Sequence, residues 1–432
     1  MSRNAGRPAI AVVGVGYVGL TSAACLAHLG LDVTAIDIDE NKIRQLNGGS
    51  SPIMELGLNQ LLVAGLASGR LRFTSDYAAT ANTDIVLLCL PTPHSERENG
   101  PDLSAVRAAV MRLREQLPLD AIIVTKSTVP VGTQRALQEL IERPDISVAS
   151  NPEFLREGTA VSDFLEPDRI VIGADHQPVA DRVAGIYRGI TAPITFCDPL
   201  SAELIKYSAN SFLATKLSYI NELTRLCDRI GADIESVAEG IGSDPRIGTS
   251  FLAPGPGWGG SCFPKDTRAL MHLARRTGQY LPVIESAYQS NLDQLDHIAD
   301  RIQQLCPTRL DRARIAVWGA TFKAGTDDTR QSPALQVIDR LIDRDATVVV
   351  YDPAAKTDDL PVVAAPDIYA ACDEADLLVV LTEWPEFADA DLTTVAQRLA
   401  GKTIYDTRQI VDPVKAADAG LYLVQLGRLP AA

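Results

Sequence analysis

The sequence of 432 residues lacks any apolar run long enough to cross a bilayer. Its longest apolar stretches, such as Ile85 to Leu90 and Leu377 to Leu381, are far shorter than the roughly 20 residues that a transmembrane helix needs. The N-terminus also lacks the features of a signal peptide, since Arg3 and Arg7 lead directly into a short strand and a glycine turn. We therefore expect a cytoplasmic protein with no membrane partner.

Positive charge is scarce as well. The chain has 40 lysines and arginines against 55 aspartates and glutamates, which gives a formal net charge of −15. This balance argues against a nucleic-acid partner, because a basic surface is needed to displace counterions from phosphates. It does not exclude a small anionic substrate, since a few cations in a cleft are enough to hold one diphosphate.

Paired cysteines are missing too. The seven cysteines are an odd number, and their spacings are not typical of a zinc site or a disulfide framework, so we expect reduced thiols and no metal. No low-complexity tract interrupts the chain, and 46% hydrophobic with 22% charged residues is typical of a soluble globular protein. At this length we expect two or three domains. The cysteines are Cys25, Cys89, Cys197, Cys227, Cys262, Cys306 and Cys372.

The N-terminal segment predicts a strand, a tight turn and a helix. The run Ala9 to Val13 precedes Gly14-Val15-Gly16-Tyr17-Val18-Gly19, and an alanine-rich apolar stretch follows to Leu29. A second strand, Asp32 to Asp37, completes a βαβ unit. This alternation continues and predicts a parallel, doubly wound sheet. The further strands are expected at Ile85 to Leu90, Ile122 to Thr125 and Ile146 to Ala149.

The pattern changes near Leu200. Residues 201–230 carry apolar side chains at helical spacing, which predicts one long helix. From Arg314 the strand-and-turn pattern returns through RIAVWGATF, ATVVVYDP, DLLVVLTEW and KTIYD, with a helix near Pro333 to Asp343. The predicted fold class is α/β, with two Rossmann-like doubly wound parallel-sheet domains joined by a long central helix. We expect domains at 1–198 and 306–432, with a central helical segment at 199–305.

The second βα pattern weakly repeats the first. Trp318-Gly319-Ala320 falls at its first turn and Tyr351-Asp352 ends its second strand, but the glycine triplet is absent. The repeat indicates a shared architecture and no second cofactor site.

In the N-terminal domain the GxGxxG turn follows a strand and opens a helix, and Asp37 ends the next strand. The glycines would let backbone N–H groups approach a pyrophosphate. Asp37 would accept hydrogen bonds from a ribose diol and would repel a 2′-phosphate. This context favours NAD over NADP, and it favours a cofactor site over a glycine turn without a ligand.

A cysteine lies in the glycine-rich stretch Gly257-Trp258-Gly259-Gly260-Ser261-Cys262-Phe263-Pro264-Lys265-Asp266. A free cysteine is usually an inert buried residue. Here the glycines before Cys262 and Pro264 after it are expected to prevent a regular helix or strand, and Lys265 would favour the thiolate. Cys262 is therefore a candidate nucleophile.

Several blocks occur in a characteristic order: the GVGYVGL turn, KSTVPVGT at 126–133, NPEFLREG at 151–158, Lys206 with Asn210, PRIG at 245–248, GGSCFPKD at 259–266, FKAGTDDTR at 322–330 and LTEWPEF at 381–387. With these blocks the chain resembles the UDP-glucose dehydrogenases of the UDP-glucose and GDP-mannose dehydrogenase family, over nearly its whole length. The resemblance implies that UDP-glucose is oxidised at C6 in two steps, through an aldehyde, by two NAD molecules in turn.

The resemblance also implies catalytic roles. Cys262 would add to the aldehyde as a thiolate, so that hydride loss gives a thioester that water hydrolyses. Lys206 and Asn210, spaced i and i+4, would stabilise the alkoxide, although helical periodicity alone equally predicts a solvated face. Asp266 would orient this water, Glu157 would activate it as a general base, and Thr128 would position it.

Two ligand-binding sets follow from the same resemblance. In the family the arginine of PRIG, here Arg246, reaches substrate across a subunit boundary, whereas Phe251 and Phe263 are equally well explained as core residues. The expected cofactor set is Gly14, Gly16, Tyr17, Val18, Gly19, Asp37, Lys42, Thr128, Glu157, Lys265 and Arg330. The expected substrate set is Glu153, Phe154, Leu155, Lys206, Asn210, Arg246, Phe251, Gly259, Phe263, Phe322, Lys323 and Arg408.

Some alternatives stay open. The substrate could be GDP-mannose or a UDP-N-acetylhexosamine, the enzyme could be a two-electron hydroxyacid dehydrogenase, or the chain could be a non-enzymatic NAD-binding regulator.

One position departs from the family, which usually has asparagine where this chain has Gln409, and this affects the local geometry of Arg408. The resemblance favours the glucose branch and a homodimer or higher homo-oligomer formed through the central helix.

Overall fold

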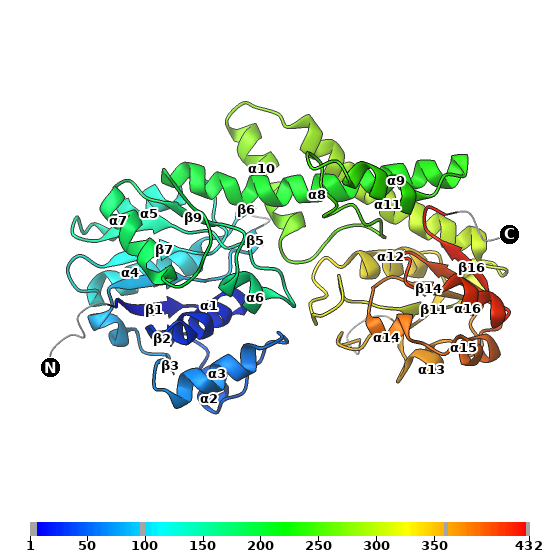
Figure 1. The fold of residues 1–432 in the computed structure, drawn as a ribbon, viewed down its shortest axis with the longest axis horizontal. Helices are drawn as coiled ribbons and strands as arrows, with labels where there is room; N and C mark the ends of the chain where they lie inside the picture. The colour runs from blue at the N-terminus through cyan, green and yellow to red at the C-terminus, as the bar shows by residue number, and fades with distance from the viewer. Residues whose placement is uncertain (1–6, 96–99, 358–361, 429–432) are drawn as a thin grey trace. The chain divides into compact units, whose positions relative to one another are not determined.

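Two β-sheets with helices on both faces organise the chain (Figure 1). The computed structural model describes residues 7–95, 100–357 and 362–428. These residues divide into two units. The first unit runs up to Ala209 and includes His272–Thr277, and the second comprises Asn210–Met271 and the residues from Gly278 onward. The predicted α/β fold class is confirmed.

The sheet of the first unit has the strand order β10-β9-β8-β7-β4-β1-β2-β3. Its strands pair in parallel, except that β9 meets β8 antiparallel through Ser150 and Gly173. The strands are β1 Ala9–Val13, β2 Asp32–Ile36, β3 Leu71–Thr74, β4 Ile85–Leu88, β7 Ile122–Thr125, β8 Ser147–Ser150, β9 Ile170–Gly173 and β10 Ile194–Cys197. The helices are α1 Tyr17–His28, α2 Glu40–Asn47, α3 Leu58–Ala67, α4 Ser104–Gln116, α5 Thr133–Ile141, α6 Ala160–Leu165 and α7 Gln177–Ala184. A short antiparallel pair of strands, β5 His94–Ser95 and β6 Gly100–Pro101, lies between β4 and α4 in the sequence.

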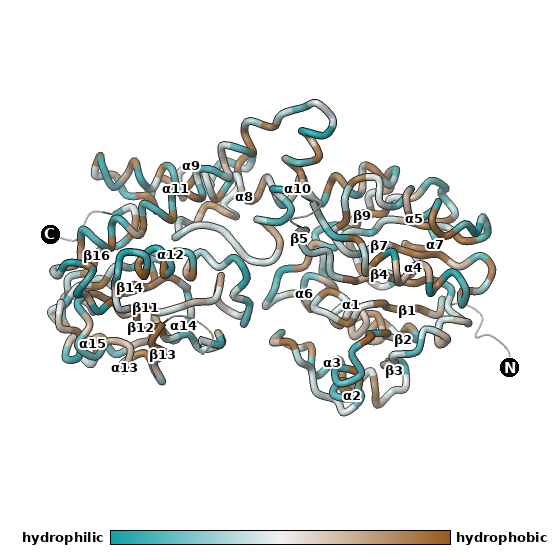
Figure 2. Tube along the Cα trace, turned by 180° about the vertical axis from the view of Figure 1, so that it is seen from behind, coloured by the Kyte–Doolittle hydropathy of each residue, from teal (hydrophilic) through white to brown (hydrophobic). Residues whose placement is uncertain are grey.

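Alternating side chains of each strand build two cores in this unit. Ile10 and Val12 of β1 face α1 and α3, whereas Ala11 and Val13 face α4 and α5. Because both faces are covered, the central strands are apolar throughout, and Figure 2 shows them in brown. This explains why short, continuous apolar runs predicted the strands correctly.

The sheet of the second unit has the order β13-β12-β11-β14-β15-β16, and all its pairs are parallel. Ile315 and Val317 of β11 face α11 and α12, and Ala316 and Trp318 face α13 to α16. The strands are β11 Arg314–Trp318, β12 Thr347–Tyr351, β13 Val363–Ala364, β14 Leu377–Val380, β15 Thr403–Asp406 and β16 Tyr422–Gln425. The helices are α9 Ile234–Gly242, α11 Pro282–Leu305, α12 Pro333–Ile342, α13 Ile368–Ala371, α14 Pro385–Ala388, α15 Leu392–Arg398 and α16 Pro413–Asp418.

Two helices contain the boundaries between the units. Helix α8, Pro199–Ile230, confirms the predicted long helix, and the division falls between Ala209 and Asn210. Helix α10, Phe263–Arg276, crosses a second division after Met271. Among the described residues, no helix has both the length and the apolar character needed to span a membrane.

Both sheets reverse their strand order beside their first strand, at β1 and at β11. Ligands of open α/β sheets bind in the crevice at the carboxyl ends of the strands at such a point. The turns that follow these two strands are built alike. The amide of Gly14 donates to Ile36 O over 2.8 Å and that of Gly319 donates to Tyr351 O over the same distance, which confirms the predicted repeat.

Candidate active site

The turn after β1 is open where a cofactor would approach it. Gly14 has φ +90°, and a Cβ on Gly19 would lie 1.8 Å from Gly14 O, so both positions exclude a side chain. A Cβ on Gly16, by contrast, would meet nothing within 4 Å. Gly16 is the N-cap of α1 and provides no side-chain cap, so the first amides of the helix are left for an anion. The turn therefore has room for a pyrophosphate, and the contact with the cofactor stays a prediction.

Asp37 lies directly after β2, at the edge of this turn. Its Oδ2 accepts hydrogen bonds from the Val15 amide at 2.8 Å and from Lys42 Nζ at 3.0 Å, and its Oδ1 accepts one from the Asp39 amide at 3.0 Å. Burial alone would raise the pKa of Asp37, but these hydrogen bonds outweigh burial and hold the pKa below its ordinary value. Asp37 is thus an ionised carboxylate at neutral pH, which is the form that would accept hydrogen bonds from ribose hydroxyls.

Tyr17 connects the turn with the predicted NPEFLREG loop. The amide of Gly158 donates to the Tyr17 hydroxyl and to Glu55 Oε2, both at 2.8 Å, and Tyr17 is itself hydrogen-bonded to Glu55. Burial raises the pKa of Glu55. Sequence analysis did not select Glu55, which holds this loop beside the cofactor turn.

Lys206 of α8 is buried against the same loop. Its Nζ is 3.1 Å from Glu153 Oε1, and the two side chains are only 4% and 7% exposed. Glu153 Oε2 also accepts the Leu155 amide at 2.6 Å, and Lys206 Nζ lies 5.3 Å from the centre of the Phe154 ring. These predicted residues form one cluster in the first unit, in which Lys206 and Glu153 are buried and Phe154 and Leu155 are partly exposed.

A buried carboxylate of α8, Glu203, holds the loop between β7 and α5. Its two oxygens accept the amides of Gly132 at 2.6 Å and of Gln134 at 2.8 Å. Gly132 is the N-cap of α5 and has no side-chain cap of its own, so Glu203 replaces it. The same loop contains Thr128, whose carbonyl accepts the Thr92 hydroxyl at 2.8 Å.

In the second unit, Asn210 and Asp266 are in direct contact. Asn210 Nδ2 donates to Asp266 Oδ2 over 2.6 Å, and both side chains are buried. Lys265 forms an ion pair with the other carboxylate oxygen of Asp266. The structure therefore pairs Lys206 with Glu153 in the first unit and Asn210 with Asp266 in the second.

Cys262 lies at the start of a helix, which corrects the expectation that Pro264 prevents one. Helix α10 begins at Phe263, and the Asp266 amide donates to Cys262 O at 2.9 Å. Proline is tolerated in a first turn because its missing N–H would have no partner there. The Cys262 side chain is half-buried, and its sulfur is 3.6 Å from Ser261 Oγ. A helix N-terminus favours a thiolate, so this position strengthens the candidate.

Two glycines let the segment before Cys262 pack against the FKAGTDDTR segment. A Cβ on Gly259 would lie 2.0 Å from Gln331 O, and a Cβ on Gly260 would lie 2.9 Å from the Phe322 ring. Phe263 lies near two aromatic rings, with centroid distances of 6.2 Å to Phe251 and 6.5 Å to Trp258. The predicted Phe251, Gly259, Phe263 and Phe322 thus line one region of the second unit.

Three of the predicted cations of the second unit, Arg246, Arg330 and Arg408, have acidic neighbours. Arg246, whose side chain is 88% exposed, pairs with Asp244, and Arg330 pairs with Asp328 at 2.7 Å. Arg408 is largely buried beside Glu383. Lys323 Nζ lies 5.7 Å from the centre of the neighbouring Phe322 ring. The described residues include no group of acidic, histidine or cysteine side chains able to hold a metal ion.

Comparison with known proteins identifies the family. Models of the UDP-glucose/GDP-mannose dehydrogenase family match the NAD binding domain at residues 8–191, the central domain at 200–293 and the UDP binding domain at 316–413. The chain belongs to the UDP-glucose/GDP-mannose dehydrogenase family. It is thus an NAD-dependent oxidoreductase, and the predicted cofactor is confirmed.

Individual relatives agree over the full length. The chain is 40% identical to the UDP-glucose 6-dehydrogenase of Rhizobium meliloti (strain 1021), covering 97% of this chain and 99% of that protein. It is also 40% identical to the UDP-glucose 6-dehydrogenase TuaD of Bacillus subtilis (strain 168), covering 97% and 93%. The UDP-glucose dehydrogenase structure from Pyrobaculum islandicum has a TM-score of 0.89 at 34% identity, covering 99% of this chain and 100% of that one.

The departure from the family pattern at Gln409 has a structural counterpart. Gln409 adopts φ +57°, a left-handed conformation that asparagine tolerates better than glutamine. Here the longer side chain reaches Leu426 O, to which Gln409 Nε2 donates over 2.8 Å. The unusual residue of this member of the family therefore gains a hydrogen bond that anchors the turn after Arg408.

Proposed function

We propose that the chain is a UDP-glucose 6-dehydrogenase that oxidises C6 of the sugar to a carboxylate. The observation that carries this proposal is the position of Cys262 at the N-terminus of α10. It lies one turn before the buried Asp266, which accepts a hydrogen bond from Asn210. An alcohol-to-acid oxidation uses a nucleophile of this kind, whereas a two-electron hydroxyacid dehydrogenase has no need of one.

In the first oxidation the C6 alcohol loses a proton from oxygen and a hydride from carbon. When bound at the first unit, NAD supplies the acceptor for that hydride. Lys206 and Asn210, four residues apart on α8, would donate hydrogen bonds to the alkoxide oxygen. Glu153, 3.1 Å from Lys206 Nζ, balances the lysine charge before substrate arrives.

In the second oxidation the thiolate of Cys262 adds to the aldehyde carbon. A C–S bond forms, the carbonyl electron pair moves to oxygen, and the resulting thiohemiacetal gives up a hydride and becomes a thioester. A second NAD would be the acceptor of this hydride. Water then adds to the thioester carbon, the C–S bond breaks, and the acid and the thiol are released. We assign the proton from this water to Glu157, with Thr128 and Asp266 holding the water.

UDP-glucose is the substrate favoured by the relatives, because those at 40% identity carry the name UDP-glucose 6-dehydrogenase. A UDP-N-acetylhexosamine is the second candidate. It is supported by the UDP-D-ManNAc dehydrogenase structure from Pyrococcus horikoshii, which has a TM-score of 0.86 at 28% identity over 97% of this chain and 99% of that one.

We also propose that the chain forms a homodimer or a larger homo-oligomer through a central segment at 199–305, between domains at 1–198 and 306–432. On α8, Phe212, Tyr219 and Leu226 repeat every seven residues and are 66%, 51% and 49% exposed. An exposed apolar stripe of this kind is typical of an interface. Phe212→Glu should therefore yield a smaller species in light scattering, and an unchanged mass would contradict the interface.

The function is tested by incubating the protein with NAD and UDP-glucose, GDP-mannose or UDP-N-acetylhexosamines. UDP-glucose should give the highest kcat/KM and two NADH per acid released. One NADH per product, or oxidation of a non-nucleotide hydroxyacid instead, would contradict the proposal.

A further inference from the structure

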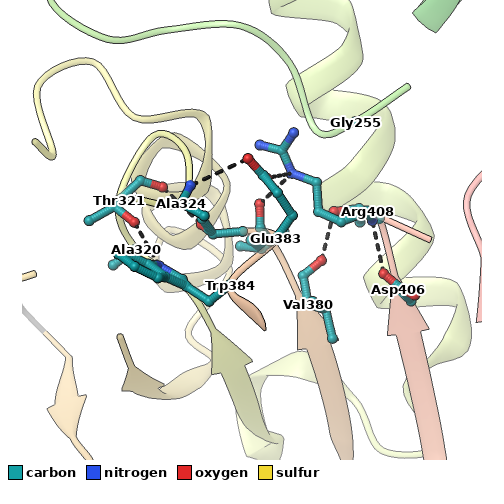
Figure 3. A network of polar contacts seen from close by, with 12 residues as sticks. Gly255, Ala320, Thr321, Ala324, Val380, Glu383, Trp384, Asp406 and Arg408 are labelled. Atoms are coloured by element: carbon teal, nitrogen blue, oxygen red, sulfur yellow. Dashed lines mark hydrogen bonds and ion pairs between the residues drawn. The ribbon is translucent and has the colours of Figure 1, made fainter. Parts of the chain in front are cut away.

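The block LTEWPEF contributed no residue to the predicted site, yet it places a carboxylate within it. Glu383 follows β14, next to the point where the strand order of the second sheet reverses. Its Oε1 accepts the amide of Ala324, the residue after Lys323, at 3.3 Å. Its Oε2 lies 3.1 Å from Arg408 Nε (Figure 3).

This carboxylate is held in place by its chain neighbours. Thr382 Oγ1 donates to Thr321 O over 2.8 Å, and Trp384 Nε1 donates to Thr321 Oγ1 over 3.1 Å. Trp384 Nε1 also lies 3.3 Å from Asp352 Oδ2. The backbone of Glu383 therefore lies between two anchored residues, one of which, Trp384, is shown with Thr321 in Figure 3.

The contact between Glu383 and Arg408 leaves polar atoms unused. The Nε–H of Arg408 donates to Leu381 O at 2.9 Å, so its approach to Glu383 is an ion pair without a hydrogen bond. Glu383 Oε2 is buried and accepts no hydrogen bond from any residue that the structure describes. The Glu383 side chain is nevertheless 37% exposed, so a ligand can approach the carboxylate and supply a hydrogen-bond donor.

Arg408 also has donors directed away from the strands. Its terminal nitrogens extend toward the backbone of Gly255, where a Cβ would lie 2.9 Å from Nη1 (Figure 3). With a side chain 17% exposed, Arg408 is enclosed but reachable.

The charges decide which ligand group fits beside this pair. Together Glu383 and Arg408 carry no net charge, and a phosphate placed here would meet the negative carboxylate. A hydroxyl suits both partners, because it can donate to the carboxylate and accept from the guanidinium. We propose that Glu383 is a specificity-determining residue that accepts a hydrogen bond from a ribose hydroxyl of the nucleotide sugar. This inference rests on the proposed function.

The test is the affinity of the full-length protein for UDP, 2′-deoxy-UDP and 3′-deoxy-UDP, measured by calorimetry. In the parent, at least one deoxy analogue should bind roughly tenfold or more weakly than UDP, since a hydrogen bond to a charged group is lost. In Glu383→Gln, UDP should bind more weakly and this ratio should fall, since the amide oxygen that remains is a neutral and weaker acceptor. The matched control is Glu386→Gln, three residues along, whose carboxylate accepts the Tyr351 hydroxyl instead. It should keep the parental ratio.

If Glu383 had a purely structural role, Glu383→Gln would weaken the binding of all three ligands equally. The ratio of the affinities for UDP and its deoxy analogue would then stay at the parental value, which would overturn the proposal. N3-methyl-UDP tests the other donor of the nucleoside. If only the penalty for N3-methylation disappears in Glu383→Gln, the carboxylate contacts the base, and the ribose assignment is wrong. Failure of the parent to bind UDP at all would instead contradict the proposed function.

Discussion

Glu203 allows a quantitative test of the buried charges in the first unit. Its side chain is 2% exposed, and its two oxygens hold the amides of Gly132 and Gln134 at the start of α5. Burial raises the pKa of Glu203 from 4.5 to about 7, despite these hydrogen bonds.

The sign of the effect follows from this rise. Between these two pKa values the folded chain keeps a proton that the unfolded chain has released, so unfolding becomes easier as the pH increases. The stabilising contribution of the protonated form is complete below the unfolded pKa and is lost as the pH rises through the folded pKa of about 7. The full difference corresponds to about 3 kcal/mol, of which about 2 kcal/mol falls between about pH 5.5 and about pH 8.

The perturbation is Glu203→Gln, which does not titrate. Relative to this variant, the parent should lose about 2 kcal/mol of unfolding free energy across that pH range, which lies above the sequence pI of about 4.8. Tryptophan fluorescence is unsuitable because Trp258, Trp318 and Trp384 all belong to the second unit. Denaturant titration followed by hydrogen exchange of peptides that span α5 reports the correct region.

The matched control is Glu139→Gln on the exposed side of α5, which should follow the parental pH dependence. If plots of unfolding free energy against pH were parallel for the parent and Glu203→Gln, the reasoning would be refuted. Parallel plots would mean that Glu203 has the same pKa in the folded and the unfolded chain.

Three further predictions concern the ligands. Cys262→Ala should still bind UDP and NAD but should form acid from UDP-glucose on the order of 10³-fold more slowly, and a near-parental single-turnover yield of two NADH would exclude covalent catalysis. Asp37→Ser should weaken NAD use and narrow the preference over NADP, measured as the ratio of kcat/KM values. An unaltered ratio would contradict the role of Asp37. Gly16→Ala should leave the unfolding transition almost unchanged, because its Cβ meets nothing within 4 Å, yet it should raise the Kd for NAD. Equal NAD affinity in both proteins would place the pyrophosphate elsewhere.

The sequence predicted those features that depend on neighbouring residues. The Gly14 turn and its following helix were predicted from local spacing, and the helix expected at 201–230 is Pro199–Ile230. Features that join distant segments were not predictable in this way. Glu203 and Gly132 are 71 residues apart, and Glu55 and Gly158 are 103 apart.

The one local error concerned the start of α10. Pro264 was interpreted as a residue that breaks helices, but the penalty for proline arises from a missing N–H inside a helix. In the first turn, where Pro264 lies, no earlier carbonyl requires that N–H. Proline directly after a candidate nucleophile is therefore compatible with a thiol at a helix N-terminus.

An aspartate follows the second strand of each repeat, Asp37 in the first sheet and Asp352 in the second, but the two carboxylates have different roles. Among the residues that the structure describes, the donors to Asp37 are the Val15 and Asp39 amides and Lys42. Asp352 is saturated by six protein donors: the amides of Ala320, Thr321, Ala354 and Ala355, the hydroxyl of Thr321 and the indole of Trp384. A neutral residue at 37 should consequently alter which cofactor is used, whereas one at 352 should damage the fold itself. Restoring a glycine triplet to the second turn would not create a dinucleotide site, because the oxygens that a ribose would need are already taken.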